Sequence, residues 1–154
     1  MPRKFLVVVD DSPEFEAALR YACRRARSTG GRVALLRVIP LGSDEHWSGV
    51  REEIEREQRA EAEALLTRLG EEATDRSGAP PLFLIEAGEA PDAIRRVVEA
   101  DPEIKIMVLA AGSGSRGPGP LVTTVLKGVG FAGRKLPVTI VPGELTEADI
   151  EDLA

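Results

Sequence analysis

Short apolar runs alternate along this chain with longer stretches in which apolar residues recur every three or four positions. Short continuous runs predict strands buried on both faces of a parallel sheet, and the longer period predicts amphipathic helices. The predicted strands are residues 4–10, 32–39, 82–86, 105–110 and 136–141. The predicted helices run from 11–14 to about 29, over 49–77 and 90–100, from 120 to the glycines of 128–133, and over 146–153. This alternation predicts an α/β fold with helices on both faces of a doubly wound sheet, as a single domain over residues 1–154.

Individual residues add detail to the predicted helices and loops. The first helix begins at Asp11-Ser12-Pro13-Glu14, which makes Asp11 its expected N-terminal cap. Cys23 lies within that helix and is interpreted as a small core residue. The loop at 41–48 holds His46 and Trp47, which we expect at the surface, with Trp47 against the rim of the sheet.

The composition narrows the classes of function. The chain has 20 Lys or Arg and 26 Asp or Glu among 154 residues, and a formal net charge of -6. Nucleic-acid binding needs clustered cations to neutralise phosphates, so this balance argues against it. No apolar stretch approaches the ~18 residues that span a membrane, and the N-terminus leads into a strand rather than a signal peptide. We expect a cytoplasmic protein without nucleic-acid or membrane partners, and without an internal disulfide because it has one cysteine.

In two segments that lie far apart in the sequence, an apolar run ends in small or acidic residues. The first strand ends at Asp10, and the fourth leads from Ala110 into a loop at 111–119. If the strand order is 3-2-1-4-5, these two strands are neighbours and the order reverses between them. Ligands of such sheets bind at that point, outside the carboxyl ends of the strands. The sequence therefore predicts a binding crevice between Asp10 and the loop.

The loop is rich in glycine, which lets backbone N–H groups approach an anion, and a helix N-terminus follows it. The candidate residues are Ala110 at the end of the strand and Gly112, Ser113, Gly114, Gly117 and Gly119 in the loop, with Thr123 and Thr124 in the first turns of the next helix. The loop lacks the G-x-x-x-x-G-K-[ST] pattern of a P-loop. An anion site is therefore one interpretation, and a flexible connection that tolerates glycine is the other.

The adjacent carboxylates Asp10 and Asp11 have different interpretations. With Asp11 assigned to the helix cap, Asp10 is the functional candidate, because a carboxylate ending a central strand is costly unless it has a partner. Asp10 would bind a ribose hydroxyl or hold Mg²⁺ together with a phosphate. No grouping of nucleophile, base and acid stands out, so we predict no catalytic residue.

Five segments resemble the universal stress protein family. They are V-V-V-D-D-S at 7–12, L-L-R-V-I-P at 35–40, G-E-A at 88–90, the glycine-rich loop, and L-P-V-T-I-V-P at 136–142. The resemblance covers nearly the whole chain in order and length. It implies a five-stranded sheet of order 3-2-1-4-5 and binding of ATP or AMP, with or without Mg²⁺, at the switch point. Asp10 matches the family's strand-one Asp, a ribose or adenine contact, and Val38 matches the strand-two residue whose backbone contacts adenine.

The family's nucleotide pattern, G-x2-G-x9-G-[ST], is incomplete in this sequence. Counted from Gly114, the second glycine is Gly117, but Lys127 and Gly128 stand at the last two positions. Counted from Ala111, the second glycine is Gly114, but Thr124 and Val125 stand last. We expect the loop to hold phosphate by a modified geometry.

The resemblance also implies a homodimer that pairs through the last strand. Val138, Ile140 and Val141 suit that role, because an apolar edge strand needs a partner or a cover. Three functions stay open: a nucleotide-binding stress-response regulatory domain with slow or no hydrolysis, an interaction module of the same fold that binds no nucleotide, and a phosphoacceptor receiver domain. Asp10 and Asp11 resemble the acidic pair of receivers, but Glu86 stands where that class needs an Asp.

Overall fold

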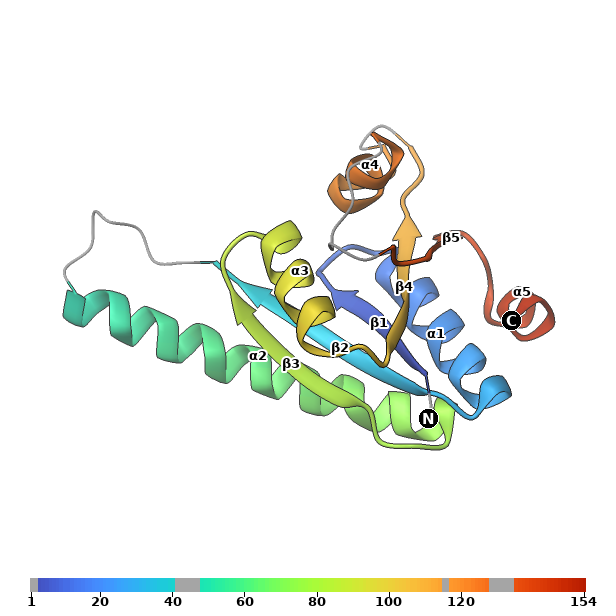
Figure 1. Cartoon of the computed structure of the whole chain (residues 1–154), viewed down its shortest axis with the longest axis horizontal. Coiled ribbons are helices and arrows are strands. Elements are labelled where there is room, and N and C mark those ends of the chain that lie inside the picture. The colour runs from blue at the N-terminus through green and yellow to red at the C-terminus, as the bar shows by residue number, and fades with distance from the viewer. Residues whose placement is uncertain (1–2, 41–47, 115–116, 128–134) are drawn as a thin grey trace.

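A parallel sheet forms the centre of the molecule (Figure 1). The computed structural model describes residues 3–40, 48–114, 117–127 and 135–154. The strand order is β3-β2-β1-β4-β5, and every neighbouring pair is parallel. The strands are β1 (Lys4–Val9), β2 (Arg32–Ile39), β3 (Leu82–Ala87), β4 (Ile104–Ala111) and β5 (Val138–Pro142). The predicted fold class and strand order are confirmed.

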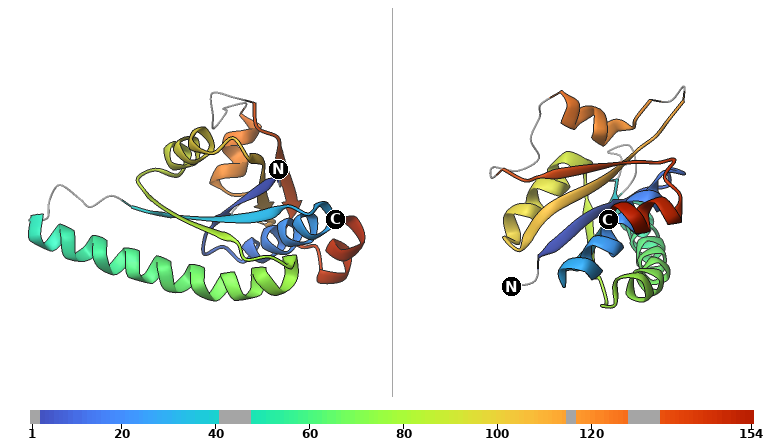
Figure 2. Two further views of the ribbon diagram at one scale, coloured as in Figure 1. Left: turned by 60° about the horizontal axis from the view of Figure 1, so that its bottom comes forward. Right: turned by 90° about the vertical axis from the view of Figure 1, so that its right-hand side faces the viewer.

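Helices cover both faces of the sheet (Figure 2). They are α1 (Phe15–Thr29), α2 (Ser48–Ser77), α3 (Ala90–Ala100), α4 (Pro120–Leu126) and α5 (Glu147–Leu153). One buried apolar cluster joins the sheet to α1, α2 and α5, and a second joins its other face to α3 and α4. The helices α1 to α4 each connect two parallel strands, as crossover helices do, and α5 follows the last strand.

Burial on both faces explains why the strands are continuous apolar runs. In β1, Phe5, Val7 and Val9 point into the cluster with α1 and α2, while Leu6 and Val8 point into the cluster with α3. None of these five side chains is more than 8% exposed. A strand with one solvated face would alternate apolar and polar residues instead.

The helix α2 is longer than the sheet that it covers. Its 30 residues span about 45 Å at the usual rise of 1.5 Å per residue, and its N-terminal half extends past the end of β2 (Figure 1). Its C-terminal half is buried in the core through Leu66, Leu69 and Ala73, whereas Val50 near its start is 45% exposed. The helix α2 therefore contributes a core face over only half of its length.

The local prediction for Cys23 is confirmed. Cys23 is fully buried in the core, and burial raises the pKa of its thiol to about 12. Thr146 caps α5: its hydroxyl oxygen accepts from the Asp149 N–H at 3.1 Å, and the Asp149 carboxylate accepts from the Thr146 N–H at 3.0 Å. The loop prediction for His46 and Trp47 lies outside the described residues. Over the part of the chain that the structure describes, no helix is both long and apolar enough to cross a bilayer.

Candidate functional site

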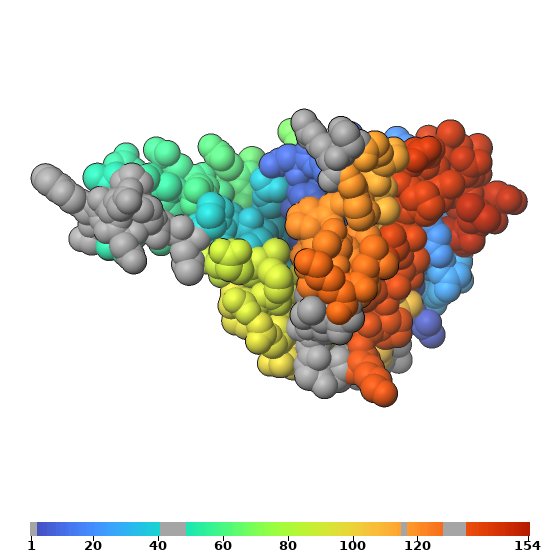
Figure 3. Space-filling model, turned by 90° about the horizontal axis from the view of Figure 1, so that it is seen from above, coloured from blue at the N-terminus to red at the C-terminus, as the bar shows by residue number. Residues whose placement is uncertain are grey.

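A cavity of about 700 Å³ opens at the carboxyl ends of β1 and β4. The strand order reverses between these two strands, so the cavity lies at the switch point where α/β sheets bind ligands. It is bounded by the β1–α1 turn, the end of β2, the β3–α3 turn, the end of β4 and the start of α4. Figure 3 looks down on this edge of the sheet, with α3 in yellow-green and α4 in orange. The volume suits a drug-sized small molecule, and we call this cavity the crevice.

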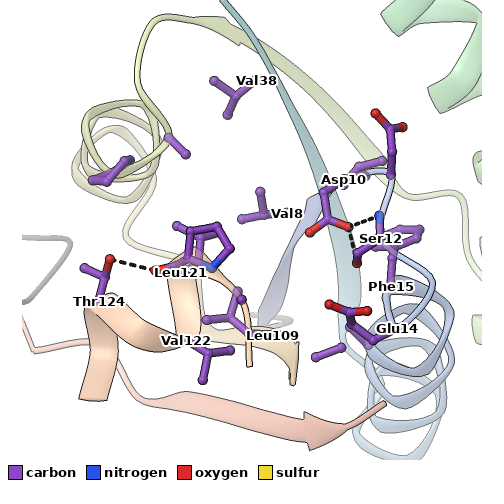
Figure 4. A pocket seen from close by; sticks show the side chains of 18 of the residues that line it. Val8, Asp10, Ser12, Glu14, Phe15, Val38, Leu109, Leu121, Val122 and Thr124 are labelled. Carbon is purple, nitrogen blue, oxygen red and sulfur yellow. Dashed lines mark hydrogen bonds between the residues drawn. The ribbon is translucent and has the colours of Figure 1, made fainter. Parts of the chain in front are cut away.

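One part of the crevice is apolar. Val8, Val38 and Leu109 come from the ends of three strands, and Leu121 and Val122 face them from α4 (Figure 4). Val8, Leu109 and Val122 are also members of the buried cluster, so the core holds these walls in place. Apolar walls held in this way are typical of small-molecule sites.

Asp10 lies on the other side of the crevice, just after β1 ends at Val9. Its Oδ1 accepts hydrogen bonds from the Ser12 N–H at 2.9 Å and from the Ser12 hydroxyl at 2.5 Å (Figure 4). The residue is exposed. The argument that a carboxylate here is costly is therefore wrong: Asp10 stands in solvent and organises the β1–α1 turn. Its second oxygen, Oδ2, has no hydrogen bond to any described residue.

The prediction that Asp11 caps α1 is wrong. The helix begins at Phe15, and its cap position is Glu14, which makes no side-chain cap hydrogen bond. Asp11 instead accepts from Nη2 of Arg37 at 3.3 Å, and Nη1 of Arg37 donates to the Val9 carbonyl at 3.2 Å. The pair ties the end of β2 to the end of β1 beside the crevice. Its contribution to stability is small, because the Asp11 side chain is 83% exposed.

The glycine-rich loop folds on itself. The Gly112 N–H donates to the Pro118 carbonyl at 3.1 Å, and the Gly117 N–H donates to the Gly114 carbonyl at 3.2 Å. Of the predicted residues, Ala110 and Gly119 line the crevice, and Gly112, Ser113, Gly114 and Gly117 do not. Gly119 has φ 109°, a backbone conformation that favours glycine, and this turn aims the start of α4 at the crevice. Ser115 and Arg116 lie outside the described residues.

The strand order excludes the receiver hypothesis, because that class has the order 2-1-3-4-5. Glu86, near the end of β3, accepts from Nε of Arg96 at 3.2 Å. Over the residues with a described placement, no three His, Cys, Asp or Glu side chains gather closely enough to hold a metal ion.

Comparison with known proteins decides the family. The model described as the universal stress protein family matches residues 1–126, most of the chain. This chain belongs to the universal stress protein family. No curated protein matches the sequence.

Solved structures share the fold of this universal stress protein over most of its length. UspA from Lactobacillus plantarum is 20% identical, with TM-score 0.72 over 90% of this chain and 97% of that one. A universal stress protein from Archaeoglobus fulgidus in complex with dAMP is 20% identical, with TM-score 0.60 over 90% and 97% of the two chains. One in complex with cAMP is 15% identical, with TM-score 0.64 over 93% and 98%.

The two predicted threonines differ in position and make the same local bond. Thr124 lines the crevice and Thr123 does not. The Thr123 hydroxyl donates to the Gly119 carbonyl at 2.8 Å, and the Thr124 hydroxyl donates to the Pro120 carbonyl at 2.9 Å. In this universal stress protein both hydroxyl protons are therefore used in hydrogen bonds to backbone carbonyls at the start of α4. In this geometry the Thr124 hydroxyl oxygen can accept a hydrogen bond from a ligand. It can donate one only after it rotates away from the Pro120 carbonyl.

Glu14 lines the crevice of this universal stress protein and was not predicted as a site residue. A Cβ on Gly112 would lie 2.9 Å from Glu14 Oε1 and 3.0 Å from the Gly117 carbonyl oxygen. A Cβ on Gly143 would lie 2.5 Å from the Glu14 Cβ. Glycine at 112 and 143 therefore lets Glu14 pack between the start of the loop and the end of β5. The only sequence signal at Glu14 was its place in the first helical turn, which says nothing about this contact.

Proposed function

We propose that this universal stress protein binds an adenine nucleotide, AMP or ATP, in the crevice, and acts as a stress-response regulatory domain with slow or no hydrolysis. The observation that carries the proposal is the position of the crevice at the switch point of a family fold. Relatives with that fold are in complex with dAMP and cAMP. Both ligands combine an adenine ring, a sugar and one phosphate, so adenosine monophosphates are the ligand class to test first.

The lining supports one orientation of such a ligand. The adenine ring would lie against Val8, Val38 and Leu109, with its polar edge toward the backbone of Val38 at the end of β2. The ribose would lie beside Asp10, whose Oδ2 is able to accept from a ribose hydroxyl. The phosphate would then lie between Gly119 and Thr124 at the start of α4 and Glu14 on the opposite, α1 side of the crevice. In this proposal Mg²⁺ arrives on the phosphates of ATP, and Asp10 is a candidate protein ligand for it.

Replacing Asp10 tests the ribose contact. Asp10→Ala is expected to weaken AMP binding about three- to tenfold, because Asp10 is exposed to water and a typical hydrogen bond contributes about 0.5–1.5 kcal/mol net. Isothermal titration of the two proteins with AMP measures it.

A matched variant separates the contact from the turn. In Asp10→Asn the amide oxygen still accepts from the Ser12 N–H, so the turn is retained while the carboxylate is lost. An Asp10→Ala protein that is folded and binds AMP as tightly as the wild type would remove Asp10 from the site. Tight binding by Asp10→Asn with weak binding by Asp10→Ala would assign Asp10 to the turn rather than to the ribose.

The second candidate function is an interaction module that binds no nucleotide. The folded loop favours it, because the Gly112 and Gly117 N–H groups already have acceptors within the loop and are not free for a phosphate.

Either function is compatible with a homodimer that pairs through β5, which lies at one edge of the sheet. Val138 and Ile140 are half-buried there, whereas Val141 is already buried in its own chain and would contribute little. Sedimentation analysis that shows only monomer at high protein concentration would remove the dimer.

A further inference from the structure

The charges around the crevice are mostly negative. Its lining carries the carboxylates of Asp10, Asp11, Glu14 and Glu89. Within the described part of that lining, Arg37 is the only cation, and it is engaged by Asp11 and by the Val9 carbonyl. Nucleotide phosphates are the most negative part of the proposed ligand, so the position of each carboxylate decides which phosphates the crevice accepts.

Glu14 stands at the loop end of the crevice. Its Oε1 lies 2.9 Å from the position of a Cβ on Gly112, and the Gly117 carbonyl oxygen lies 3.0 Å from the same position, so two oxygen atoms stand beside the first glycine of the loop. The Glu14 carboxylate has no hydrogen bond or ion-pair partner among the residues that the structure describes. Figure 4 shows it on the α1 side of the crevice, on the same side as Asp10 and Ser12 and opposite Thr124.

We propose that Glu14 sets the charge selectivity of the crevice, so that adenosine and AMP bind in preference to ATP. The inference rests on the proposed nucleotide site and names which member of that ligand class the site takes. A fixed negative charge beside the loop repels each added phosphate, whereas it does not change the affinity for an uncharged nucleoside. The half-buried position strengthens the repulsion, because water screens a partly buried charge less than an exposed one.

The test is a charge series of ligands on wild type and Glu14→Gln. Adenosine, AMP and ATP are titrated calorimetrically in EDTA, so that no divalent cation masks the phosphates. Gln has the shape of Glu and keeps the packing against Gly112 and Gly143. Glu14→Gln is expected to leave adenosine affinity unchanged, to raise AMP affinity about fivefold and to raise ATP affinity more than that.

Glu89→Gln is the matched control, because Glu89 also lines the crevice but lies at the start of α3. It is expected to change the ratio of ATP to AMP affinity by much less than Glu14→Gln. An equal change in both variants would mean that net charge, and not the position of Glu14, sets the selectivity, and would overturn the proposal. Weaker ATP binding by Glu14→Gln in the presence of Mg²⁺ would also overturn it, because Glu14 would then be a metal ligand.

Salt gives a second readout that needs no variant. Raising NaCl from about 50 mM to about 500 mM is expected to bring the ATP affinity of the wild type closer to its AMP affinity, because salt screens repulsion. If the ligands bind but the Glu14→Gln and salt effects are the same for all three, the selectivity proposal fails and the nucleotide site stands. If adenosine, AMP and ATP all fail to bind both proteins, the proposed function itself fails.

Discussion

Val38→Trp is expected to weaken AMP binding at least about tenfold, a loss of about 1.4 kcal/mol or more. Val38 is half-buried at the end of β2, and its side chain faces the apolar part of the crevice (Figure 4). An indole there would fill the space proposed for the adenine ring. Because the side chain borders a cavity, most of the added volume enters the crevice rather than the core. Calorimetric titration with AMP measures the loss, and a thermal melt confirms that the variant folds.

Val38→Ala is the control for that substitution. The proposed contact to adenine is made by the backbone of Val38, which alanine leaves in place. Val38→Ala is therefore expected to keep AMP affinity within about threefold of the wild type, since only part of one buried side chain is lost. A folded Val38→Trp protein with wild-type AMP affinity would place the base elsewhere.

Leu35→Ala is expected to lower the free energy of unfolding by about 2–5 kcal/mol. Leu35 is completely buried in β2, where β1 and β3 flank it and the cluster with α1 and α2 covers it. Its truncation removes apolar contacts and leaves a cavity that the strands on both sides prevent from closing. The loss is a large part of the roughly 5–15 kcal/mol that stabilises a typical domain. Urea denaturation followed by circular dichroism measures it.

The same substitution at Leu153 is the control, because that side chain in α5 is 63% exposed. Leu153→Ala is expected to change the free energy of unfolding by less than about 0.5 kcal/mol. Equal losses at the two positions would contradict the assignment of Leu35 to the core.

The strands of the sheet were predictable because their burial is visible in short stretches of the sequence. Burial on both faces demands continuous apolar strands, and β1 shows this directly, with Val7 and Val8 pointing into opposite clusters. The crevice followed from strand order, which the family resemblance supplied. The sequence did not predict how much of α2 packs against the core, because the apolar residues of a helix do not show where the sheet that it covers ends.

Contacts between distant segments were beyond the sequence pattern. Asp11 has the side chain of a helix cap, but Arg37 of another strand pairs with it instead. Glu14 packs against Gly112, which lies 98 positions later in the chain, and no periodicity in the sequence predicts that contact. The number of glycines in the loop likewise did not reveal that the Gly112 N–H already donates to the Pro118 carbonyl. Each miss concerns which partner a polar group takes once the chain is folded.

The most direct test of the central claim is calorimetric titration of the wild-type protein with AMP and with ATP-Mg²⁺, after any bound nucleotide has been stripped. The account predicts saturable binding of AMP in the micromolar range, with one site per chain. Absence of heat and of any competition at millimolar AMP and ATP would contradict it. The folded glycine loop would then mark a universal stress protein that acts through its surfaces instead of a nucleotide.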